Sequence, residues 1–166
     1  MQSYNIAFIG PKSGKSCYRR RLCLENFSDH YAPTYPFDVD NYIHYRGEYS
    51  TMFTIWDYES DETIYDAYVK GKEAILVFYD LTTDETLKSD LNIINRYQHL
   101  DVPILLCGLK SDLILKETFN QKFNGPSNIP HFIISSKNLD STYQPFDYLC
   151  EILDNQILVK YAGKIL

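Results

Sequence analysis

The segment GPKSGKS at residues 10–16 combines residue types that bind phosphate groups. A phosphate site needs a strand that leads into a sharp turn, backbone N–H groups that point inward, and a helix that begins behind them. The usual pattern has four residues between its first Gly and the Gly-Lys-Ser/Thr that follows. Here Pro11, Lys12 and Ser13 make only three, and Pro11 has no N–H, so the loop is one residue and one donor short.

The second half of this loop keeps the groups that act on a nucleotide. Gly14 allows close backbone approach, Lys15 supplies a cation for the terminal phosphates, and Ser16 supplies a hydroxyl for Mg²⁺. The alternative is a Gly-Lys turn that binds no ligand. An alignment without a deletion would put Ile9 in the place of the first Gly, but Ile resists a positive φ, so we favour the deletion.

The strands that position this loop follow from the hydrophobic pattern. Apolar runs of strand length alternate with segments of helical period, which predicts an α/β domain on a largely parallel sheet. Residues 74–79 and 104–107 are continuously apolar, as expected for central strands covered by helices on both faces. Further strands are expected at 4–10 and 131–135. An antiparallel hairpin is expected at 41–57, with Arg46-Gly47-Glu48 as a three-residue turn.

The helices around these strands follow from apolar residues at helical spacing. A helix at residues 15–27 would begin directly from the glycine-rich turn. A second helix, behind the cap residue Thr83, has apolar residues at i, i+4 and i+7 from Leu87, and a shorter one is expected within residues 113–123. The final helix is expected from its apolar stripe, which consists of Phe146, Leu149, Cys150, Leu153 and Ile157.

Composition limits the partners of the chain. Its 166 residues, 45% of them hydrophobic, fit one compact domain, which we place at residues 1–166. A net charge of −6 and a pI near 5.1 argue against a broad nucleic-acid surface or a basic membrane patch. The one basic cluster, Arg19-Arg20-Arg21, is expected to be a solvated helix face.

Cysteine usage and hydropathy indicate the compartment. The cysteines are widely spaced with no CxxC pair, which favours reduced thiols and a cytosolic protein; they are Cys17, Cys23, Cys107 and Cys150. No apolar stretch approaches the length of a membrane span, and no Cys lies near residue 166 to be prenylated. No direct membrane anchor is therefore expected in this chain, so association with a membrane would need a partner or a trimmed tail.

Four further segments resemble motifs of the Ras superfamily of small GTPases, in the order of that family. FSDHYAPT at 27–34 and WDYESDE at 56–62 resemble its first and second switch regions. GLKSDL at 108–113 and SSK at 135–137 resemble its two guanine-contacting motifs. The resemblance covers essentially the whole chain. It implies the P-loop NTPase fold, with a six-stranded, mostly parallel sheet, one antiparallel edge strand and helices on both faces.

Two details are more similar to the Rab branch than to Ras proper. They are Trp56 before Asp57, and the run VFYDLTTDETL at 77–87. The resemblance then implies a nucleotide-dependent switch that acts through effector binding in vesicle traffic or signalling. Its partner-binding segments would be residues 28–38 and 57–70, and we expect a monomer.

The resemblance also implies the ligands of the phosphate end, which are GDP or GTP and Mg²⁺. Lys15 would meet the β and γ phosphates, Ser16 and Thr34 would coordinate the ion, and Asp57 would act on it through water. Thr34 has an ordinary alternative as a loop hydroxyl. The candidate catalytic residues are Lys15, Thr34 and Asp61, and the candidate metal residues are Ser16, Thr34 and Asp57.

At the base end, the resemblance places Phe27 edge-on against guanine and Lys110 over the base plane. Asp112 would accept hydrogen bonds from the guanine amide and amine, and the backbone of residues 135–137 would donate to the base carbonyl. Alternatively, Phe27 closes the first helix on the core and Asp112 caps a helix. The full set of expected nucleotide contacts is Gly10, Lys12, Ser13, Gly14, Lys15, Ser16, Cys17, Phe27, Lys110, Asp112, Ser135, Ser136 and Lys137.

Departures from the family pattern predict weaker binding and slow hydrolysis. Leu109 replaces an Asn whose amide ties the base to the phosphate loop, which predicts roughly a tenfold loss of affinity. Ser60 replaces a Gly whose N–H meets the γ phosphate, and Asp61 replaces the Gln that orients the attacking water. The alternatives are a pseudo-GTPase interaction module and an ATP-using P-loop enzyme. The latter leaves the guanine motifs unexplained.

Overall fold

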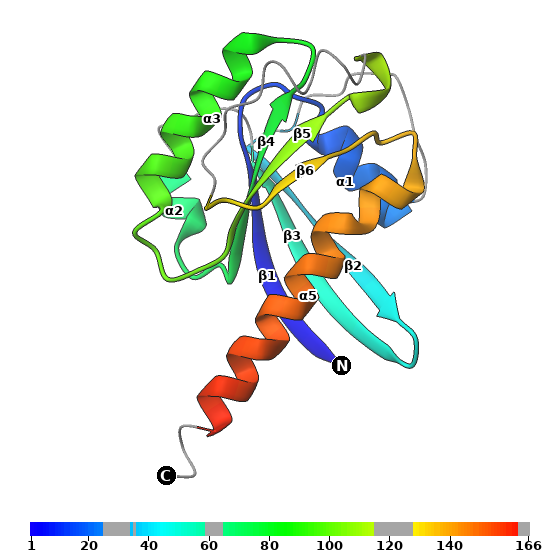
Figure 1. Ribbon diagram of the computed structural model, residues 1–166, viewed down its shortest axis with the longest axis vertical. Helices are drawn as coiled ribbons and strands as arrows, with labels where there is room; N and C mark the ends of the chain where they lie inside the picture. Colours follow the sequence, from blue (N-terminus) through cyan, green and yellow to red (C-terminus); the bar gives the residue numbers. More distant parts are fainter. Residues whose placement is uncertain (25–33, 35, 59–64, 115–127, 163–166) are drawn as a thin grey trace.

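The computed structural model describes residues 1–24, 34, 36–58, 65–114 and 128–162. Across these residues six strands form one sheet, in the order β2-β3-β1-β4-β5-β6 (Figure 1). Neighbouring strands run parallel except for the edge pair β2 and β3, so the predicted sheet architecture is confirmed. The strands are β1 Gln2–Ile9, β2 Phe37–Arg46, β3 Tyr49–Tyr58, β4 Ala74–Asp80, β5 Ile104–Leu109 and β6 His131–Ile133.

Helices cover both faces of the sheet, which explains the uninterrupted apolar sequence of its centre (Figure 1). Every residue of β4 and β5 is buried. On one face α1, Lys15–Leu24, and α5, Leu139–Ala162, contribute Tyr18 and Phe146 to the core. On the other face α2, Tyr65–Val69, and α3, Asp84–Tyr97, contribute Val69 and Ile94.

The hairpin of β2 and β3 differs from the expected one. Arg46 pairs with Tyr49, so the turn has two residues, Gly47 and Glu48, and the predicted three-residue turn is wrong. Gly47 has a φ of 60°, and a positive φ at the first turn position alone is typical of a type II′ hairpin turn. At its other end β2 begins at Phe37 instead of residue 41, because its ladder with β3 continues that far.

The remaining elements follow the sequence with small shifts. The stripe of α5 is buried at Phe146, Leu149, Cys150 and Leu153, while the side chain of Ile157 lies outside the described residues. The helix expected at residues 15–27 is described only to Leu24. Of the helix expected within 113–123, only residues 113 and 114 are described, and Leu113 ends the 3-10 turn η2, Ser111–Leu113. In the part of the chain that the structure describes, no helix is long and apolar enough to cross a membrane.

Candidate functional site

The glycine-rich turn lies between the end of β1 and the start of α1. Gly10 has a φ of 129°, and a Cβ at this position would lie 2.3 Å from the carbonyl oxygen of Phe78. Only glycine fits this position, because both the backbone conformation and the neighbouring strand exclude a side chain. Ile9 is instead the last residue of β1 and is fully buried. The geometry therefore favours Gly10, and not Ile9, as the first Gly of the loop.

The groups of this turn can receive an anion. Ser13 is 1% exposed, and its Oγ has no hydrogen-bond partner among the described residues. A buried hydroxyl without a partner is costly, and a phosphate oxygen would accept a hydrogen bond from it. Lys12 is exposed and Cys17 half-buried at the two ends of the loop. The unpartnered Ser13 hydroxyl fits a phosphate group, as expected of a loop that leads into a helix N-terminus.

Three residues predicted for a metal ion lie near Lys15. The Oγ of Ser16 lies 2.8 Å from Oγ1 of Thr34, which brings two predicted ligands together from α1 and from the segment before β2. Asp57, at the end of β3, is 0% exposed, and its Oδ1 lies 3.6 Å from Nζ of Lys15. Hydroxyl and carboxylate oxygens are the ligand types that Mg²⁺ prefers, so these residues fit that ion.

Arg19 is a buried residue in contact with Asp57, and the sequence interpretation missed it. It is only 5% exposed, so the expected solvated face is wrong at this position. Its Nε lies 3.2 Å from Oδ2 of Asp57, its Nη2 donates to Oδ2 of Asp38 at 2.6 Å, and its Nη1 pairs with Asp40. One signal was available, because Arg19 is four residues after Lys15 and therefore shares its face of α1.

The base end has its side chains in place at the ends of β5 and β6. Ser135 donates from its hydroxyl to Oδ1 of Asp112 at 2.7 Å, and Nζ of Lys137 lies 3.5 Å from the other carboxylate oxygen. The Ser135 hydrogen bond is the largest cause of a lowered pKa at Asp112, so this carboxylate stays ionised. Ser136, between Ser135 and Lys137 in the sequence, is half-buried. The arrangement provides acceptors for a base with paired N–H donors.

Lys110 is fixed by its backbone and by its side chain. It has a φ of 66°, and its Nζ donates to Oδ2 of Asp80 at 2.5 Å. Burial alone would raise the pKa of Asp80, but hydrogen bonds from Lys110 and Thr82 outweigh it and lower the pKa. The aliphatic stem of Lys110 lies close to the phosphate loop. A Cβ at Gly14 would lie 3.7 Å from Cε of Lys110.

The base motif meets the phosphate loop through an apolar contact. Leu109 is buried, and its Cδ1 would lie 4.0 Å from a Cβ at Gly14. The residue that replaces the family's Asn therefore packs beside the loop and offers no hydrogen bond to it. Two other predicted residues, Phe27 and Asp61, lie outside the described residues.

An aromatic cluster joins the described parts of the two predicted partner-binding segments, 28–38 and 57–70. The ring of Phe37 lies 5.9 Å from those of Tyr58 and Tyr68, between centroids, and Tyr58 and Tyr68 stack at 4.2 Å. Phe37 is nevertheless 37% exposed. The cluster therefore presents aromatic surface where β2 begins and β3 ends, on the sheet face opposite to that of Asp38 and Asp57.

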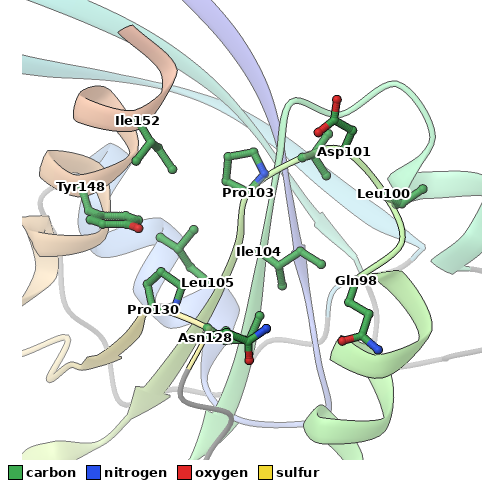
Figure 2. A pocket seen from close by; sticks show the side chains of 12 residues that line it. Gln98, Leu100, Asp101, Pro103, Ile104, Leu105, Asn128, Pro130, Tyr148 and Ile152 are labelled. Carbon is green, nitrogen blue, oxygen red and sulfur yellow. The ribbon is translucent and has the colours of Figure 1, made fainter. Parts of the chain in front are cut away.

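A separate cavity of about 480 Å³ lies at the opposite end of β5 (Figure 2). Pro103 and Ile104 line it where β5 begins, with Pro130 before β6 and Tyr148 from α5. Lys110 follows the other end of the same strand. This cavity is therefore distinct from the predicted nucleotide site.

The turn at Gly10 and the polar side chains after β5 and β6 together define a P-loop nucleotide-binding domain. The family model described as "Ras family" matches residues 5–154, which is nearly the whole chain. The chain therefore belongs to the Ras family. Members of this family in general bind guanine nucleotides together with Mg²⁺.

Two relatives agree with this assignment. The chain is 30% identical to "GTP-binding protein YPTM2" of Zea mays over 154 residues, covering 86% of this chain and 76% of that protein. It is 28% identical to "Ras-related protein RABD2b" of Arabidopsis thaliana over 171 residues, covering 96% of this chain and 85% of that protein. Both names are of the Ypt/Rab type, so the predicted similarity to the Rab branch is confirmed.

Proposed function

We propose that this chain is a guanine-nucleotide-binding switch built as one domain over residues 1–166, with GDP or GTP and Mg²⁺ as ligands. The observation that carries the proposal is the carboxylate of Asp112, which Ser135 and Lys137 hold ionised after the end of β5. Guanine offers an amide and an amine to such a carboxylate, whereas adenine has no matching pair of donors. Guanine nucleotides are therefore preferred.

At the phosphate end, Lys15 is the residue that would bind the terminal phosphates. Its Nζ faces Asp57 at 3.6 Å, so binding exchanges this contact for phosphate oxygens. Ser13 would donate its buried hydroxyl, and Ser16 with Thr34 would hold Mg²⁺. When bound, that ion neutralises charge on the phosphates. Lys12 would add a solvent-exposed cation.

Hydrolysis of GTP to GDP and phosphate is proposed to be slow. The proposal rests on residue type, since Ser60 and Asp61 lie outside the described residues. A carboxylate at Asp61 can accept a hydrogen bond from water but cannot donate one as an amide does, and it repels the phosphate being transferred. The substitution Asp61→Gln is expected to raise the single-turnover rate.

Partners are proposed to bind the aromatic cluster and the segments that it joins. Phe37 is exposed on β2, while Tyr68 comes from α2, so the cluster reports the relative position of both segments. Aromatic residues of this kind are enriched at protein interfaces. Effector and regulatory proteins would therefore distinguish the GDP and GTP forms here, as expected for a monomeric Rab-like switch.

The first experiment identifies the nucleotide. Mass spectrometry of the ligand carried by purified protein is expected to find GDP. Calorimetry with GDP, GTP and ADP is expected to show tighter binding of the first two than of ADP. Recovery of an adenine nucleotide, or equal affinity for GDP and ADP, would contradict the proposal.

A pseudo-GTPase module is the second candidate. It is favoured by the two ion pairs of Asp57, with Lys15 and Arg19, which already offset its charge. The residue types of Ser60 and Asp61 favour it too. A single-turnover hydrolysis assay separates the two functions, with Lys15→Ala as the variant that removes binding. The switch predicts slow, measurable hydrolysis that Lys15→Ala abolishes. The module predicts no hydrolysis and partner binding that Lys15→Ala leaves intact.

A further inference from the structure

Arg19 occupies a buried position between α1 and the antiparallel edge of the sheet. Each of three guanidinium nitrogens contacts a different carboxylate. Nε contacts Asp57 on β3, Nη2 contacts Asp38 on β2, and Nη1 contacts Asp40 on β2. Asp38 and Asp40 share one face of β2, and Asp38 pairs with Asp57 in the ladder. The side chain thus joins three elements at one point.

This geometry depends on the shape of arginine. The guanidinium is planar and has five N–H donors in a fixed fork, so it can bind several carboxylates in one plane. A lysine offers a single ammonium on a flexible stem and cannot reproduce the same directions. The orientation of the Asp57 carboxylate is therefore fixed from its Oδ2 side. Its Oδ1 faces Lys15 and has no hydrogen-bond partner among the described residues.

The charges of the cluster make Arg19 more important once a nucleotide binds. Lys15 and Arg19 contact three carboxylates between them, those of Asp38, Asp40 and Asp57. A phosphate would draw Lys15 away from Asp57. Arg19 is then the cation that still holds this 0% exposed carboxylate.

We propose that Arg19 is a positioning residue for the Mg²⁺ site. It holds Oδ2 of Asp57, so that Oδ1 stays directed toward the side of Lys15 and Ser16. It also fixes β2 through Asp38, four residues after Thr34, and so restrains the other predicted ligand segment. This inference rests on the proposed function, because it concerns the ion that accompanies the nucleotide.

Two effects of Arg19 on the ion have opposite signs, so an experiment can separate them. A cation beside Asp57 repels Mg²⁺ and weakens its binding. A hydrogen-bonded partner also orients the carboxylate, and removing such partners typically lowers metal affinity by about 10–100-fold. The positioning role requires the second effect to be larger.

The experiment measures release of a fluorescent GDP analogue over a range of Mg²⁺ concentrations. Arg19→Met is compared with wild type, with Arg19→Lys as the conservative variant. Arg20→Met removes an equal charge about 100° around the helix axis and serves as the matched control. If Arg19→Met does not fold, the triple variant Arg19→Met, Asp38→Asn, Asp40→Asn replaces it. The triple variant removes the guanidinium together with the charges of two carboxylates that it contacts.

Arg19→Met, or the triple variant, is expected to raise the Mg²⁺ concentration for half-maximal slowing of release by about 10–100-fold. At saturating Mg²⁺ the release rate should stay within a few-fold of wild type, a split that a general loss of stability would not give. Arg19→Lys should recover part of the shift, and Arg20→Met should match wild type.

A half-maximal Mg²⁺ concentration that is unchanged or lower in the Arg19 variants would overturn the inference, because charge repulsion would then dominate or positioning would be absent. If wild-type protein binds no guanine nucleotide, or releases it independently of Mg²⁺, the proposed function fails together with the inference. If wild type responds to Mg²⁺ and Arg19→Met responds equally, only the inference fails.

Discussion

The two ends of the candidate site are built differently. At the base end, Asp112 has a 30% exposed side chain and is held by one hydrogen bond from Ser135 and an ion pair with Lys137. At the ion end, the fully buried Asp57 forms ion pairs with both Lys15 and Arg19. Arg19 also forms ion pairs with two further carboxylates, those of Asp38 and Asp40. Exposed groups contribute separately, whereas buried charges act as a unit. Substitutions should therefore have graded effects at the base end and large, coupled effects at the ion end.

Lys15→Ala tests the ion end and should have the largest effect on nucleotide affinity. It removes charged hydrogen bonds to the phosphates, each typically about 1.5–3 kcal/mol, and leaves Asp57 with one cation fewer. We expect GDP affinity to fall more than about 100-fold in a fluorescence titration. Lys88→Ala, on the exposed side of α3, is the charge-matched control. A loss below tenfold for Lys15→Ala would break the comparison.

The pH dependence of stability tests His131, the first residue of β6, which is the strand that leads to Ser135 at the base end. Burial lowers the pKa of His131 to about 4, from 6.5 when unfolded, so the unfolded chain binds more protons between these values. The contribution of His131 to stability is fully present above pH 6.5 and is lost as the pH falls toward 4, by up to about 3 kcal/mol at about 1.4 kcal/mol per pKa unit.

Urea unfolding at a series of pH values measures this loss. The variant His131→Gln should flatten the dependence between pH 6.5 and 4.5, while His99→Gln, which removes an exposed histidine, serves as the control. An equally steep dependence in His131→Gln would show that other groups cause it.

Asp112→Ala tests base recognition by one residue. The loss of hydrogen bonds to a charged acceptor should weaken GDP binding by about 1.5–3 kcal/mol. ADP binding should change little, so the GDP-to-ADP affinity ratio falls by the same factor. Calorimetry with both nucleotides measures the ratio, and Glu151→Ala on the exposed side of α5 controls for charge. Equal loss for both nucleotides would contradict a role in base selection.

Leu109→Asn should have the smallest effect and the opposite sign. An amide here could connect the base motif to the loop, since Leu109 packs beside Gly14. One such hydrogen bond is typically worth about 0.5–1.5 kcal/mol, so GDP affinity should rise by up to about tenfold. Leu24→Asn, at an exposed position of α1, is the matched control in the same titration. A decrease in affinity would indicate that the apolar contact is the better one.

Much of the fold could be predicted from local sequence. The apolar runs of β4 and β5 are continuous because helices cover both faces, and Gly10 stands where a strand leads into a helix. The turn of the hairpin could not be predicted to the residue. Arg46 was assigned to the turn, but it extends the ladder by pairing with Tyr49.

The Arg19 cluster could not be predicted from the sequence. Asp38 and Asp40 alternate as residues on one strand face do, but the expected strand began after both of them. Without that strand, three arginines in a row favoured a solvated helix face. The spacing from Lys15 is a local signal for the face of Arg19, but its carboxylate partners follow only from the packing of α1 against β2, which brings residues 19 and 38 together.

Gly108 on β5 allows a side chain of β4 to reach β6 across it. Its missing side chain makes room for the ring of Tyr79, whose hydroxyl lies 2.8 Å from Nε2 of His131. An edge strand of three residues would ordinarily fray, with amide protons that exchange rapidly with solvent. Here separation of the edge also requires the Tyr79 contact to break. The β6 amides that bond to β5 should therefore exchange more slowly in wild type than in a Tyr79→Phe variant, which lacks this contact.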